Sequence, residues 1–209
     1  MQLPMIRSAA DVAALVEGMG FLPFFRHAIP GFSIAECCPP ELWFSDTQDG
    51  PWEWKGPVIR QTGCAYGKFF RGKACFISRD WFPDFANYRR DGYDYDARVD
   101  EGLARHRDLR IMEVLTACPT SMLSKELKEQ SCTGGDSRKQ FDSCVTGLQM
   151  QGYITTADFS YATAKSGKAY GWGMARYATP EAFFGEAFTE RVYATSPENS
   201  RERMREHLE

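Results

Sequence analysis

At 209 residues, with 43% apolar and 14% aromatic residues, the chain has globular composition and room for one sizeable core or two small domains. No segment approaches the roughly 20 apolar residues of a membrane span, and the first residues lack the pattern of a signal peptide, so we expect a cytoplasmic protein without membrane contact. A net charge of −3 excludes a strongly basic nucleic-acid-binding chain, although the charge is unevenly distributed.

Cysteine and histidine usage indicates no metal or cofactor site. The seven cysteines include no C-x-x-C pair, and buried reduced thiols are the better interpretation. His27, His106 and His207 are far apart in the sequence, and no Gly-x-Ser-x-Gly, phosphate-binding glycine loop or H-E-x-x-H motif is present. We therefore expect no metal and no cofactor.

The first part of the chain predicts one helix and then an irregular aromatic segment. Ser8, with Asp11 three residues later, begins a helix that runs to about Gly18. Between residues 21 and 40 phenylalanines alternate with prolines, which exclude a long regular element. These aromatic side chains either line a pocket or belong to a loop that covers the core.

Aromatic and basic residues are interleaved in the next segment. Trp52 and Trp54 are followed by a predicted β-hairpin that carries Lys68 and turns at Arg71-Gly72-Lys73. Such cations hold phosphates while neighbouring aromatic rings stack on bases in many nucleic-acid-binding proteins. A core sheet with a solvated basic turn fits the same pattern equally well.

The following segment predicts a helix and then a linker. Residues 78–90 have a thick aromatic face, with Ser78 as the expected N-cap. The acidic residues from Asp91 to Glu101 resemble a calcium loop only superficially, because the sixth position lacks the glycine of an EF-hand. We interpret them as a solvated acidic linker.

Residues 102–179 predict a winged helix, a helix-turn-helix variant whose third helix usually meets a groove of the duplex. Helices are expected over residues 105–118, 123–130 and 136–152, and strands over residues 153–162 and 170–177. Ser137 is the expected N-cap of the third helix, with Gln140 completing a capping box. The turn between the strands carries Lys165 and Lys168. This unit holds ten Lys or Arg against seven Asp or Glu, so it is mildly basic in an acidic chain.

Two proline-initiated helices follow, from Thr179-Pro180 to Phe184 and from Ser196-Pro197 to about Leu208. The predicted fold class is therefore α+β. An aromatic-rich α/β N-terminal portion (residues 1–101) precedes the winged helix-turn-helix unit (102–179) and a short helical tail (180–209), and the three are expected to form one compact body.

The chain resembles a family of small bacterial proteins described as AlkZ-related, after winged-helix DNA glycosylases that excise alkylated or crosslinked bases. The resemblance rests on residues 50–55, 66–73 and 76–78, on Trp172-Gly173 and on residues 177–180. It implies a winged-helix, DNA-associated role and leaves activity open.

The glycosylases, which are longer, carry a Gln-x-Gln or Gln-x-Asp motif. Gln149-Met150-Gln151 matches this motif in sequence. If both glutamines are helical, however, their side chains point about 200° apart and cannot share one site.

Three functions are compatible with the sequence. The first is binding of double-stranded DNA linked to repair, with contacts from Ser137, Arg138, Lys139, Lys165 and Lys168, and a second set from Lys68, Arg71 and Lys73. The second is base excision, with Trp52 and Trp54 lining a pocket for a flipped base. The third is a protein-interaction module, since fold alone does not settle function. The sequence does not indicate the oligomeric state.

Overall fold

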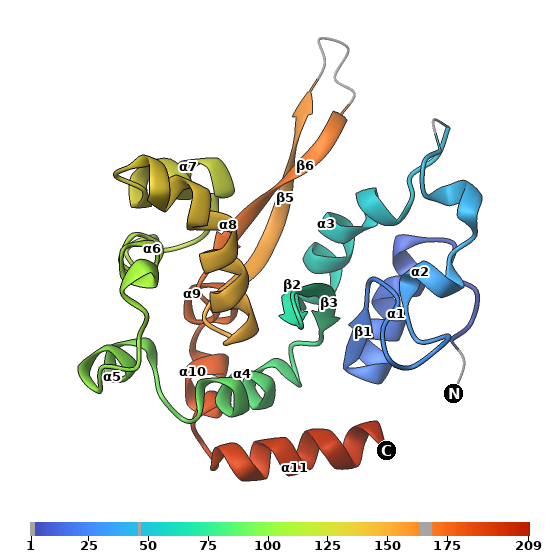
Figure 1. Ribbon diagram of the computed structural model, residues 1–209. Helices are drawn as coiled ribbons and strands as arrows, with labels where there is room; N and C mark the ends of the chain where they lie inside the picture. Colours follow the sequence, from blue (N-terminus) through green and yellow to red (C-terminus); the bar gives the residue numbers. More distant parts are fainter. Residues whose placement is uncertain (1–2, 46, 164–168) are drawn as a thin grey trace.

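An antiparallel sheet connects the two halves of the chain in the computed structural model, which describes residues 3–45, 47–163 and 169–209 (Figure 1). Its strand order is β1-β3-β2-β5-β6-β4, and every pair of neighbours is antiparallel. The strands are β1 Phe21–Pro23, β2 Ala65–Phe70, β3 Lys73–Ile77, β4 Met122–Leu123, β5 Thr155–Thr163 and β6 Ala169–Ala178. Tyr66 of β2 pairs with Thr156 of β5, and this pair joins the N-terminal strands to the later hairpin.

Helices surround this sheet in three groups, each with its own apolar core. They are α1 Ala9–Met19, α2 Ile34–Cys37, α3 Pro51–Thr62, α4 Phe82–Arg90, α5 Tyr95–Asp100, α6 His106–Thr116, α7 Ser124–Ser131, α8 Gly135–Met150, α9 Pro180–Phe184, α10 Glu186–Val192 and α11 Pro197–Leu208, with a 3-10 turn, η1, over Pro40–Leu42. One core lies under α1 to α3, a second between the sheet, α4 and the C-terminal helices, and a third among α6, α7 and α8. The model is thus a mixed α/β structure. No helix of the described residues is long and apolar enough to cross a lipid bilayer.

The predicted α1 is confirmed, and its start follows from one hydrogen bond. The Ser8 hydroxyl accepts from the Asp11 backbone N–H at 3.2 Å, which satisfies a free donor of the first turn. The proline-rich residues 21–40 contain only the three-residue β1 and the four-residue α2, in agreement with the expected lack of long elements. Phe21 and Phe24 are buried in the core.

Helix α3 was not expected from the sequence, because Gly56 and Pro57 interrupt its pattern. Pro51 occupies the first turn, where a missing N–H costs little, and the Glu53 carboxylate accepts from the Gly50 backbone N–H at 2.9 Å. Pro57 lies inside the helix and removes one backbone hydrogen bond. Burial of Trp54, Val58 and Ile59 offsets that loss.

The hairpin of β2 and β3 is confirmed, with its reversal at Arg71 and Gly72. Both residues have positive φ angles, 52° and 71°, as a two-residue hairpin turn of type I′ requires. Glycine adopts this conformation without strain, so Gly72 follows directly from the turn geometry.

The helix predicted over residues 78–90 is confirmed as α4, but two details of this part of the chain were wrong. Helix α4 begins at Phe82, and Ser78 makes no cap bond to it; Pro83 suits the first turn because it lacks an N–H. The predicted acidic linker contains α5, whose first turn is capped by the Asp94 carboxylate accepting from the Ala97 N–H at 2.7 Å. Asp94, which we assigned to a solvated linker from the sequence, is therefore the N-cap of α5.

Residues 102–179 contain the three predicted helices, as α6, α7 and α8, followed by the paired strands β5 and β6. The short β4, which pairs with β6 through Met122 and Tyr177, was not predicted. Ser137 is not the N-cap of α8: Gly134 is, and the Ser137 hydroxyl donates to the Gly134 carbonyl at 2.8 Å. A flexible Gly-Gly pair lets the helix begin three residues earlier than the serine indicates. Lys165 and Lys168 lie outside the described residues.

The C-terminal helices cover α4. Thr179 caps α9 and Ser196 caps α11, as predicted, whereas α10 was missed. Asn87 of α4 donates to the Ser200 hydroxyl of α11 at 3.0 Å, and Figure 1 shows α11 lying beneath α4. The tail is thus a packing element of the core.

Candidate nucleic-acid interface

Several basic residues line a cavity of about 770 Å³, called here the basic cleft. It is lined by Arg26, His27, Ala28, Phe69, Phe70, Arg71, Lys73, Arg89 and Met150. Four of these nine residues are Lys or Arg, and none is Asp or Glu. The lining is therefore chemically suited to an anion.

Four separate segments build the basic cleft, and hydrogen bonds fix their positions. The Lys73 ammonium donates to the Arg26 carbonyl at 2.9 Å, which ties the hairpin to the segment after β1. The Arg89 Nε donates to the Met150 carbonyl at 2.7 Å, which joins the C-terminal ends of α4 and α8. Arg71 stands at the hairpin turn and is exposed. Two of the predicted contact residues, Arg71 and Lys73, thus meet in one site.

The charge of the basic cleft is only partly neutralised. Arg26 forms a salt bridge with Glu36 at 3.2 Å. Arg71, Lys73 and Arg89 form no salt bridge with any residue that the structure describes. Three cations thus remain available to a ligand, and the aromatic side chain of Phe70, 37% exposed, lies beside them.

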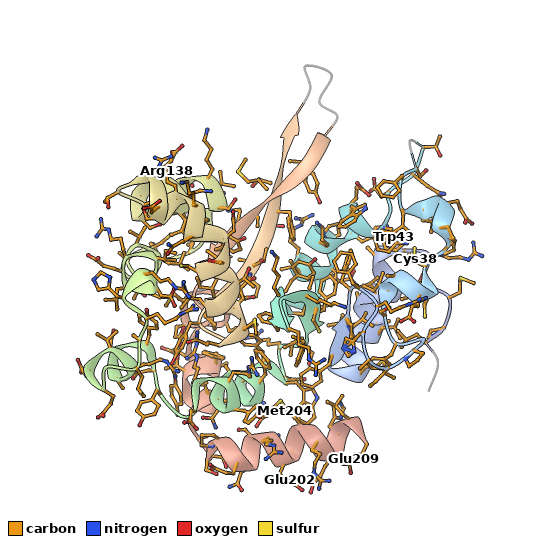
Figure 2. All side chains as sticks on the ribbon, in the orientation of Figure 1. Cys38, Trp43, Arg138, Glu202, Met204 and Glu209 are labelled. Carbon is orange, nitrogen blue, oxygen red and sulfur yellow. The ribbon has the colours of Figure 1, made fainter. Side chains whose placement is uncertain are left out.

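The predicted contacts at the start of α8 form a different and less basic surface. Ser137, Arg138 and Lys139 are exposed there, and Figure 2 shows Arg138 at the end of α8 that lies beside α7. Lys139 approaches Asp136 at 3.7 Å, and Lys128 of α7 approaches Asp142 at 3.9 Å.

Helices α7 and α8 together carry four Lys or Arg and four Asp or Glu, so this surface has no net charge. An α-helix of 16 residues spans about 24 Å, and Met150 is the last residue of α8. The two sets of predicted contacts therefore lie at opposite ends of one helix. Of the two, the basic cleft carries the greater excess of positive charge.

The remaining predicted residues lie outside the basic cleft. Trp54 is 5% exposed and belongs to the N-terminal core. Trp52 is half-buried against Trp43, with ring centroids 5.4 Å apart. Neither tryptophan lines the basic cleft, and neither does Lys68, which is exposed on β2.

Gln149 is a structural bridge. It is 3% exposed, its side-chain oxygen accepts from the Lys68 backbone N–H at 3.1 Å, and its amide nitrogen donates to the Thr156 hydroxyl at 3.3 Å. Gln149 therefore connects α8 to β2 and β5. Both polar ends of its side chain are engaged, so it is not free to position a water molecule with Gln151.

Sequence reasoning missed Arg26, His27 and Arg89 as members of the site. Arg89 stands near the end of the helix predicted over residues 78–90, and Arg26 stands in the irregular aromatic segment. No local signal brings them together, because the contacts of the basic cleft connect residues far apart in sequence, such as Arg26 and Lys73.

Lys55 of α3 is a second unusual cation. It is 9% exposed, and its ammonium lies over the rings of Phe159 at 4.3 Å and Trp52 at 5.2 Å. No described carboxylate forms a salt bridge with it. Burial lowers the pKa of Lys55 to about 8, and the nearby Glu53 carboxylate only partly opposes that shift.

This burial predicts a pH dependence of stability. The folded-state pKa is about 8 and the ordinary value is 10.5, so the unfolded chain binds more protons between these pH values. Relative to Lys55→Met, wild-type stability should therefore rise by about 3 kcal/mol as the pH increases from 8 to 10.5. Urea unfolding of both proteins across this range measures the difference, and a difference independent of pH would contradict the burial of the charge.

Comparisons with known proteins place the chain in a family. The AlkZ-related family matches residues 6–209. One solved structure, the Streptomyces sahachiroi DNA glycosylase AlkZ, aligns with a TM-score of 0.46 and 9% sequence identity, over 74% of this chain and 41% of that protein. The chain thus spans less than half the length of that glycosylase. No curated protein matches. Because the family match covers nearly the whole chain, the protein belongs to the AlkZ-related family.

Proposed function

We propose that the protein binds double-stranded DNA and takes part in the repair of damaged bases. The observation that carries this proposal is the basic cleft, in which Arg71, Lys73 and Arg89 have no carboxylate partner among the described residues. Membership of the AlkZ-related family, which is named after a DNA glycosylase, supports DNA as the polyanion. Phosphate contacts of this kind supply most of the affinity of DNA-binding proteins.

The proposed interface extends from the basic cleft along α8. Residues 102–179 then form a winged-helix unit, with α8 facing a groove and with Ser137, Arg138 and Lys139 near the backbone at its N-terminal end. The antiparallel pairing of β4 with β6 supports this architecture, because it attaches the segment between α6 and α7 to the sheet that contains β5 and β6. Lys165 and Lys168, which lie between β5 and β6 in the sequence, are proposed as further contacts.

Fluorescence anisotropy of a labelled duplex, titrated with protein across a salt series, tests the proposal. The three cations of the basic cleft alone predict a slope of about −3 in a plot of log K against log salt concentration, and each further phosphate contact along α8 should make the slope more negative by about 1. An alkylated duplex carried through the same incubation and then examined for abasic sites tests base excision separately. Absence of binding at low salt would refute the proposal and favour a protein-interaction module.

A further inference from the structure

A second cavity of about 560 Å³ adjoins the basic cleft, and the two share His27 and Phe70 in their walls. This apolar pocket is lined by Gly18, Met19, Phe21, Pro23, His27, Ile29, Phe32, Phe70, Cys75, His207, Leu208 and Glu209. Figure 2 shows Glu209 at the end of α11, on the side of the molecule that holds α1 and β1. The volume of the apolar pocket falls within the roughly 300–1,000 Å³ typical of small-ligand pockets.

The apolar pocket gathers hydrophobic side chains that solvent reaches. Ile29 is 52% exposed, Leu208 is 55% exposed and Phe70 is 37% exposed. Phe21 and Phe70 meet edge to face, with ring centroids 6.4 Å apart. An apolar, aromatic hollow of this kind favours a flat, poorly hydrated group over a charged one.

One polar group lies at the junction of the two cavities. His27 Nδ1 is buried and has no hydrogen-bond partner among the described residues. The other histidine of the pocket is already engaged: His207 Nε2 bonds to the Met19 carbonyl at 2.9 Å, and its ring stacks on Trp81. Of the two histidines that line the apolar pocket, His27 is thus the one whose ring nitrogen Nδ1 has no described partner.

We infer that the apolar pocket receives an unpaired base of a DNA strand whose backbone crosses the basic cleft. This inference rests on the proposed function and extends it from the backbone to the base. An occupant that spans the shared wall would place an apolar aromatic group in the apolar pocket and negative charge in the basic cleft. A nucleotide within a strand has that composition, because its base is joined through the sugar to a phosphodiester on either side, whereas a fatty acid offers one carboxylate to three available cations. Phe70 provides a stacking surface, as aromatic side chains do in single-strand binding sites.

Anisotropy with two duplexes tests the inference, one fully paired and one identical except for a single bulged nucleotide. Wild-type protein should bind the bulged duplex about tenfold more tightly. Gly18→Trp should reduce this preference below twofold, since a Cβ at Gly18 meets no atom within 4 Å and a large side chain fits at the pocket rim. Ile29→Asn, which removes an apolar side chain from the pocket lining without adding charge, should also reduce the preference below twofold. Neither change should alter binding of the paired duplex.

Two controls accompany these variants. Gly18→Ala keeps the pocket open, and Leu103→Trp adds the same bulky ring at a position that is 51% exposed and outside both cavities. Both should keep the wild-type preference. Equal binding of the two duplexes by wild-type protein, or a preference that survives both Gly18→Trp and Ile29→Asn, would overturn the inference while leaving duplex binding intact. Failure to bind either duplex would overturn the proposed function as well.

Discussion

Replacing Arg90 by Met should lower the free energy of unfolding by about 3–5 kcal/mol, because it breaks a buried charged network. Arg90 of α4 is completely buried. Its guanidinium donates to the Gly152 carbonyl at 2.8 Å, to Glu181 at 2.7 Å and to the Tyr193 hydroxyl at 2.8 Å. It also lies 4.6 Å from the centre of the Tyr153 ring. Met fills similar space but leaves the Gly152 carbonyl without its donor.

Urea unfolding followed by circular dichroism measures this loss. Arg205→Met is the matched control, since Arg205 forms salt bridges with Glu202 and Glu209 on the exposed face of α11. Exposed ion pairs contribute little, so this variant should unfold at the wild-type midpoint. Equal midpoints for Arg90→Met and wild type would show that the buried network is not a source of stability.

Removing two charges from the basic cleft should lower duplex affinity about 100-fold at low salt, on the basis of two lost charge-assisted hydrogen bonds. The double variant Arg71→Asn with Lys73→Gln suits the fold, because Asn tolerates the positive φ of the hairpin turn better than most residues. The slope of log K against log salt should become less negative by about 2, one unit for each lost phosphate contact.

Arg201→Gln with Arg205→Gln removes the same charge from α11, outside the basic cleft. This control should change affinity less than twofold, because it alters the net charge but no proposed phosphate contact. An equal loss of affinity in the two double variants would mean that net charge, and not the basic cleft, governs binding.

Local sequence signals predicted much of the fold. Ser8, Thr179 and Ser196 cap helices because a side-chain oxygen satisfies a backbone donor a few residues away. The hairpin at Arg71 and Gly72 is equally local, since the turn residues and alternating strands are contiguous in sequence.

The errors arose where distant contacts outweighed local preference. Helix α3 contains Gly56 and Pro57, and it forms because Trp54 and Val58 are buried against the N-terminal core. Helix geometry already argued against a catalytic role for Gln149, but the sequence did not reveal its partners Lys68 and Thr156, which β2 and β5 supply. Side-chain chemistry alone does not reveal such partners.

The candidate site was only half predictable for the same reason. Arg71 and Lys73 were identified because they interrupt an aromatic hairpin. Arg26 and Arg89 join them only after β1, α4 and α8 have been placed around the sheet. The sequence also favoured the start of α8 as a contact surface. Basic and acidic residues are balanced there, and only the structure shows that Lys139 approaches Asp136 and Lys128 approaches Asp142.

The most direct test of the account is an NMR titration of the ¹⁵N-labelled protein with a short duplex. The account predicts that the largest amide shifts occur at residues 26–28 and 69–73, which line the basic cleft, with further shifts along the exposed face of α8. Shifts concentrated on α5 or α11, with residues 69–73 unchanged at saturation, would contradict the assignment of the basic cleft as the DNA-binding site.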